Sequence, residues 1–161
     1  MSLTFAMIWP FSFLAIAVVD DLCFKKFHNW LFITLTLVGV CHLIWFSSLT
    51  PWQALGGFVV GGALMLPLVL MGAIGAGDMK FMMCFGILLG TIMTFEVFVY
   101  ALFWGALIGV LQSLFAGKIS QLLANMIGFA LKQRPVNGQK IPYTVAILMG
   151  WLTHHQIGGL L

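Results

Sequence analysis

The sequence predicts an all-α, polytopic membrane protein in which about six helices cross a bilayer. Of its 161 residues, 62% are hydrophobic and only 7% carry a full charge, whereas about a quarter are charged in an ordinary soluble domain. A soluble surface built from this sequence would consist largely of Leu, Phe and Met. Composition therefore excludes a soluble globular domain. The net charge of +3 and the scattered basic residues also exclude an ordinary nucleic-acid-binding protein.

Six apolar runs approach the roughly 20 residues that a membrane-spanning helix needs. They cover residues 3–19, 30–46, 54–73, 81–95, 97–116 and 141–152. Glu96 alone separates the fourth run from the fifth, so we expect these two to form a tight helical hairpin. The whole chain, residues 1–161, is expected to be one integral-membrane domain.

The basic residues give the orientation of these spans. All seven lie in the links after the first, third and fifth runs: Lys25, Lys26, Lys80, Lys118, Lys132, Arg134 and Lys140. Basic links favour the cytoplasmic side of a membrane. This side is therefore expected to be cytoplasmic, with both termini external. Tryptophans also lie near the expected span ends, as interfacial anchors do: Trp30, Trp45, Trp52 and Trp151.

The link over residues 117–140 carries an apolar stripe at helical spacing. Its members are Ile119, Leu122, Leu123, Met126, Ile127, Ala130 and Leu131. The stripe predicts an amphipathic helix near 119–131 that lies on the inner leaflet. A helix packed against the other spans explains the same pattern equally well.

Acidic side chains in so apolar a chain are candidates for function. Asp20 and Asp21 end the first run, and Asp78 precedes the fourth. Two crossings separate Asp21 from Asp78, so both return to the same membrane face and can lie side by side. In the simpler alternative, Asp78 only caps a helix, and Asp20 and Asp21 are solvated charges.

Two glycines surround the position before Asp78. Gly75 and Gly77 permit backbone conformations closed to other residues and allow another chain to approach closely. Gly75-Ala76-Gly77-Asp78 resembles the GxGD motif of membrane-embedded aspartyl proteases, and the following Lys80 is typical of the type IV prepilin peptidase branch.

Two further motifs carry this resemblance. In the prepilin peptidases the first catalytic Asp is followed by a pattern close to D-x6-P-N. Asp21 and Asn29 have this spacing, with His28 where proline is usual, so Asp20 remains an alternative. Ile141-Pro142-Tyr143 is similar to the Ile-Pro-Tyr or Ile-Pro-Phe that opens the last span in these enzymes.

The resemblance implies a bacterial plasma-membrane endopeptidase that removes the leader peptide of type IV prepilins or pseudopilins at the cytoplasmic face. Asp21 and Asp78 would be catalytic. Gly75, Gly77, Lys80, Asn29 and Pro142 would bind substrate or shape the site. The chain is similar in size to the peptidases of tight-adherence (Flp-type) pilus systems. It lacks the paired CxxC region of the bifunctional members, so we expect cleavage without N-methyl transfer. The expected partners are pilin precursors and lipid, with no nucleic acid, cofactor or metal.

A pair of carboxylates can hydrolyse a peptide when one is charged and the other neutral. The N-terminus of a helix stabilises an anion and the C-terminus disfavours one. Asp78 is therefore expected to be the base and Asp21 the acid. The main alternative is a small membrane transporter or pilus-assembly subunit, in which the same carboxylates bind ions or serve a structural role.

Overall fold

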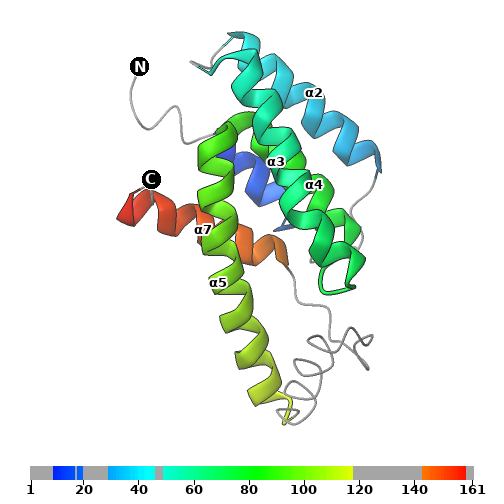
Figure 1. The fold of residues 1–161 in the computed structure, drawn as a ribbon, viewed down its shortest axis with the longest axis vertical. Coiled ribbons are helices and arrows are strands. Elements are labelled where there is room, and N and C mark those ends of the chain that lie inside the picture. Colours follow the sequence, from blue (N-terminus) through cyan, green and yellow to red (C-terminus); the bar gives the residue numbers. More distant parts are fainter. Residues whose placement is uncertain (1–8, 17, 20–28, 46–48, 118–142, 159–161) are drawn as a thin grey trace.

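The computed structural model describes residues 9–16, 18–19, 29–45, 49–117 and 143–158, and every regular element among them is helical (Figure 1). Residues 9–16 form one helical segment. The other helices are α2 (Asn29–Trp45), α3 (Pro51–Leu70), α4 (Ala76–Leu89), α5 (Thr91–Phe115) and α7 (Tyr143–Ile157). The predicted all-α class is confirmed for this part of the chain. The amphipathic helix expected near 119–131 lies outside the described residues.

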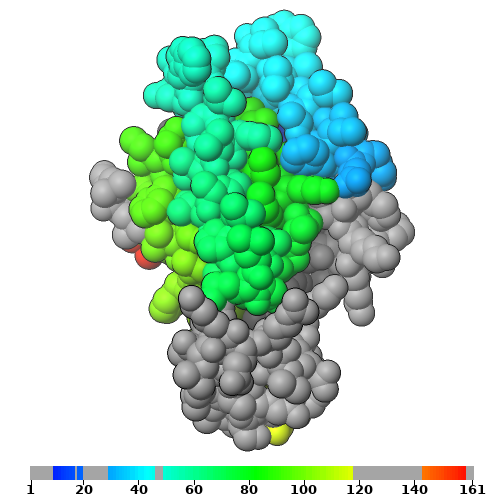
Figure 2. Space-filling view, turned by 45° about the vertical axis from the view of Figure 1, so that its right-hand side comes forward, coloured from blue at the N-terminus to red at the C-terminus, as the bar shows by residue number. Residues whose placement is uncertain are grey.

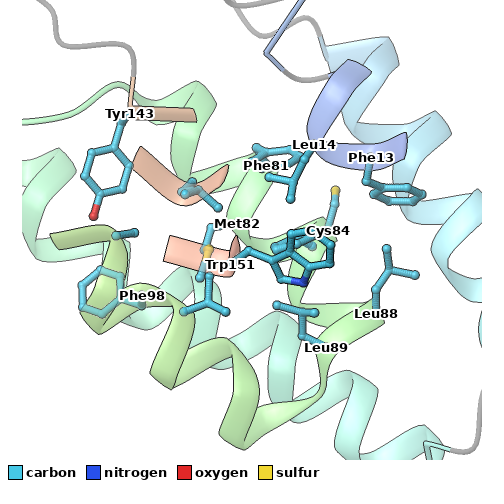
Figure 3. Close-up of a cluster of buried hydrophobic side chains, with 14 of the residues drawn as sticks. Phe13, Leu14, Phe81, Met82, Cys84, Leu88, Leu89, Phe98, Tyr143 and Trp151 are labelled. Carbon is cyan, nitrogen blue, oxygen red and sulfur yellow. The ribbon is translucent and has the colours of Figure 1, made fainter. Parts of the chain in front are cut away.

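Helix α4 forms the centre of the bundle. It contacts α2, α3, α5 and α7, and nearly all of its residues from Phe81 onward are buried. The helical segment at 9–16 adds Phe13 and Leu14 to the same core, beside Phe81 and Cys84 (Figure 3). A helix that is apolar on all sides is stable where neighbouring helices or lipid cover it, and α4 is covered by neighbouring helices. The core therefore encloses the helix that carries Asp78.

Glycines bring the backbones of α3 and α4 together. A Cβ atom at Gly57 would collide with the carbonyl oxygen of Gly86, and one at Gly61 would lie 2.6 Å from the carbonyl oxygen of Met82. Small residues allow helices to approach in this way, and the contact gains dispersion energy along both backbones. This contact fixes α4 against α3, side by side in Figure 1.

The predicted boundary between the fourth and fifth spans is wrong. The chain breaks at Gly90, and α5 begins at Thr91, so Glu96 lies inside a helix and is buried. Gly90 has φ +76°, a left-handed conformation that side-chain-bearing residues rarely adopt. Hydropathy alone did not mark this break because glycine is compatible with an apolar run.

Helix α7 packs against α5 through apolar and polar contacts. Trp151 is 4% exposed, so its predicted role as an interfacial anchor is wrong. Because α7 continues to Ile157, Trp151 lies within the helix rather than at its end. Trp104 Nε1 donates a hydrogen bond to Thr153 Oγ1 at 2.8 Å, which joins α5 to α7.

The outside of the bundle is strongly apolar. Helices α3 and α5, of 20 and 25 residues, are long and apolar enough to cross a membrane. Much of the α3 surface is open to the outside (Figure 2). Among the side chains of α3, Leu55, Val59 and Leu70 are more than half exposed. Three exposed tryptophans lie at helix ends, as predicted: Trp30, Trp45 and Trp52.

Candidate active site

Asp78 occupies the first turn of α4. The helix starts at Ala76 with Gly75 as its N-cap, so Asp78 is the third helical residue rather than the cap itself. Its Oδ2 atom accepts a hydrogen bond from the backbone N–H of Gly75 at 3.1 Å. This contact satisfies one of the N–H groups that a helix start leaves unpaired. The positive end of the helix dipole also stabilises a carboxylate at this position.

Gly75 acts through its small size. Gly75 has φ −79° and ψ 149°, an ordinary extended conformation, and the left-handed glycine of this turn is Gly72, with φ +73°. The unusual backbone expected at Gly75 and Gly77 is therefore found at Gly72 instead. A Cβ atom at Gly75 would lie 3.2 Å from Asp78 Oδ2. Glycine at this position leaves room for the carboxylate.

Lys80 and Asn29 meet across two helices. Lys80 Nζ donates a hydrogen bond of 2.6 Å to Asn29 Oδ1. Lys80 belongs to the first turns of α4, and Asn29 is the first residue of α2. Hydrogen bonds with a charged partner are shorter and stronger than neutral ones. The contact brings together two residues that the sequence assigned to the same site.

Tyr143, the last residue of the Ile-Pro-Tyr motif, has packing contacts that the sequence did not reveal. It opens α7 and is 4% exposed. Its ring packs against α5, where a Cβ atom at Gly105 would lie 3.0 Å from Tyr143 Cε2. One indication of this was present in the sequence: Tyr143 carries a polar hydroxyl at the expected start of an apolar span.

The remaining predicted site residues lie outside the residues that the structure describes: Asp21, its alternative Asp20, and Pro142. The pairing of Asp21 with Asp78 therefore remains a prediction. Asn29 follows Asp21 by eight residues, and its bond to Lys80 joins the start of α2 to the helix that carries Asp78.

A second polar pair, partly buried, lies on the α5–α7 interface. Glu96 Oε2 and His154 Nδ1 are 3.2 Å apart. Glu96 is in the second turn of α5, which follows the end of α4 opposite to Asp78. Within the described ranges, no three His, Cys, Asp or Glu side chains lie close enough together to hold a metal ion.

A comparison with protein-family models gives a match over more than half of the chain. Residues 8–110 fit the model described as the type IV leader peptidase family. This range includes Asp20, Asp21, Asn29, Asp78 and Lys80. No curated protein matches the chain significantly, and no solved structure does so either.

Proposed function

Because the chain belongs to the type IV leader peptidase family, we propose that it is a membrane-embedded aspartyl endopeptidase with Asp21 and Asp78 as its catalytic pair. Membership in this family implies a peptidase that acts on prepilin-type leaders. Beyond family membership, we propose the aspartyl mechanism, the cytoplasmic location of the active site and the identity of the catalytic residues. The observation that carries it is the position of Asp78, on the first turn of a central, enclosed helix.

The site favours one charged carboxylate. Asp78 lies at a helix N-terminus and accepts the Gly75 N–H, and both features stabilise an anion. Asp21, at the expected C-terminal end of the first span, would have the opposite helix dipole and would hold the shared proton. Two carboxylates held close together divide into one ionised and one neutral group, as two-carboxylate peptide hydrolysis requires.

In the proposed reaction, Asp78 takes a proton from a water molecule, whose oxygen attacks the scissile carbonyl carbon. Asp21 donates its proton to the carbonyl oxygen or to the leaving amine. The C–N bond then breaks, releasing the leader with a new carboxyl end and the mature pilin with a new amino end. Protons and electron pairs balance within the pair of carboxylates and water.

The surface of the bundle supports a membrane location. Large apolar side chains are exposed over α2, α3 and α5, and water would make such a surface costly, whereas lipid would not. We propose a multi-pass protein of the bacterial plasma membrane with about six spans, Asp78 at the cytoplasmic face and both termini external. The basic links on the Asp78 side support this orientation.

Pilin precursors suit such a site. Their basic leader would remain at the cytoplasmic surface, and their apolar segment would lie against the exposed apolar helices. Lys80, Asn29, Gly75, Gly77 and Pro142 would shape the cleft for the extended backbone of the substrate. The chain is proposed to act without N-methyl transfer, because its three cysteines form no CxxC pair.

Co-expression with a prepilin from the same genome tests this function. Leader removal is followed by gel shift and N-terminal sequencing, for wild type and for Asp21→Asn, Asp78→Asn and Asp20→Asn at equal membrane levels. We expect the first two variants to lose cleavage and Asp20→Asn to retain it. Cleavage that persists in Asp78→Asn would exclude the aspartyl mechanism. Proton- or cation-dependent transport by a chain that cleaves no prepilin would favour the transporter alternative.

A further inference from the structure

Polar side chains join α2 to α4 at two levels. At the helix starts, Lys80 donates a hydrogen bond to Asn29. One turn further along α4, the sulfur atom of Cys84 lies 3.2 Å from the hydroxyl oxygen of Thr36. Residues 80 and 84 share one face of α4, and residues 29 and 36 share one face of α2. The two contacts therefore follow in the same order along two parallel helices.

The donor in the deeper contact can be assigned from the available protons. Thr36 Oγ1 donates to the carbonyl oxygen of Phe32 at 2.8 Å, which uses the only proton of this hydroxyl. The Cys84 thiol is therefore the donor to Thr36. Its sulfur is also 3.6 Å from the Phe32 oxygen, so the thiol has two acceptors on α2. Cys84 is 0% exposed, so water does not replace these partners.

Apolar packing by itself does not fix where α2 lies along α4. Apart from a few polar side chains, α2 is apolar on every side, so a slide or rotation would exchange one apolar contact for another. Separation of Cys84 from Thr36 would instead leave buried polar groups without their partners. A single buried polar contact between apolar helices sets their register in this way. Its low-dielectric surroundings also strengthen it relative to the exposed Lys80–Asn29 bond.

We propose that Thr36 and Cys84 are positioning residues for leader cleavage, because their contact fixes the register of α2 on α4 and so holds Asn29 at Lys80. Lys80 follows Asp78 by two residues on the same helix. This inference rests on the proposed function. Neither Thr36 nor Cys84 would touch the substrate. Their effect would reach the site through the two helices, as a change in the geometry that the reacting groups need.

Thr36→Val and Cys84→Ala each remove one half of the contact. Thr34→Val is the matched control for the first variant, because Thr34 makes the same 2.8 Å bond to the carbonyl oxygen of Trp30 on the exposed side of α2. Cys41→Ala is the control for the second, because Cys41 is exposed. Cys84→Ser keeps a donor at this position. All would be purified in detergent, tested for folding by thermal unfolding, and assayed for kcat and KM on a synthetic prepilin peptide.

We expect Thr36→Val and Cys84→Ala each to lower kcat by about three- to tenfold with little change in KM. The two controls and Cys84→Ser should retain wild-type kinetics. In an Asn29→Ala protein, Thr36→Val should lower kcat no further, because the bond that it positions is already absent. A role in stability alone would lower the unfolding temperature and leave kcat unchanged below the transition. Unchanged kcat, or a full further loss in the Asn29→Ala protein, would overturn the inference.

A distance measurement tests the register without cleavage. Nitroxide labels on Trp30→Cys and Ala76→Cys report the starts of α2 and α4, since both positions are exposed. The remaining cysteines would be replaced by alanine, with serine or alanine at position 84. We expect one narrow distance distribution with Cys84→Ser and a shifted or broader one with Cys84→Ala. Identical distributions would overturn the inference.

Asp78→Asn separates the inference from the proposed function. If it abolishes cleavage while Thr36→Val and Cys84→Ala match wild type, only the positioning role fails. If it cleaves normally, the proposed function fails, and the label distances still decide whether Cys84 sets the register of the two helices.

Discussion

The ammonium group of Lys80 donates a 2.6 Å hydrogen bond to the side-chain oxygen of Asn29, a residue 51 positions earlier in the chain. The bond joins the first turns of α4 and α2. Asp78 lies on one of these turns, and Asp21 precedes the other by only a short link. The Lys80–Asn29 pair is therefore well placed to set the separation of the two proposed catalytic groups.

This pair should show energetic coupling in catalysis. We expect Lys80→Met and Asn29→Ala each to lower kcat/KM by about tenfold, and the double variant to lose little more, because either change removes the same bond. Asn29→Asp should retain activity, since a carboxylate also accepts from Lys80. Prepilin cleavage assays on the four proteins give the coupling energy. Fully additive losses would show that the two residues act separately.

Close packing of α3 on α4 should be sensitive to a single methyl group. Gly86→Ala would force the new Cβ atom into the backbone of Gly57. Overpacking of this kind costs about 1–3 kcal/mol, and more where backbone must move. We expect a clear decrease in the thermal unfolding temperature in detergent. Gly39→Ala is the control, because its methyl would meet Ile87 at 3.4 Å. Equal stability of the two variants would contradict the packing.

The Glu96–His154 pair should stabilise the fold without taking part in cleavage. His154→Ala leaves the buried carboxylate without its α7 partner, 3.2 Å away. His154 is only partly buried, so we expect removal of this polar partner from the buried carboxylate to cost about 1–3 kcal/mol. Replacement of the exposed neighbour, His155→Ala, should cost much less. Unfolding curves measure the difference, and kcat below the unfolding transition should match wild type for both. A selective loss of kcat in His154→Ala would show that this pair takes part in the reaction.

The two ends of the bundle should face opposite sides of the membrane. Ala76 is exposed two residues before Asp78, and Ile157 is exposed at the end of α7. Each would be replaced by cysteine in a variant that lacks the native cysteines. We expect an impermeant maleimide added to intact cells to label Ile157→Cys alone. Ala76→Cys should react only after the membrane is opened. Labelling of Ala76→Cys in intact cells would reverse the proposed orientation.

Much of the fold was determined by composition and local pattern. The excess of apolar residues predicted helices throughout, and the described part of the chain is helical. The ends of α2 and α3 lie within about three residues of the predicted runs, because polar residues or, at the end of α3, a glycine lie close to them. The GxGD motif, Lys80 and Asn29 indicated the family, and the match over residues 8–110 confirms it.

Tertiary structure decided which apolar residues are enclosed and which side chains meet. Hydropathy treated Gly90 as part of a span and Trp151 as an anchor, but a left-handed glycine ends α4, and α7 continues past Trp151 into a buried position. Every helix here is apolar on most sides, so no hydrophobic face indicates its neighbours. The central position of α4, the Lys80–Asn29 bond and the burial of Tyr143 against Gly105 depend on contacts between distant segments. Local sequence does not encode such contacts, because they arise only when the helices pack.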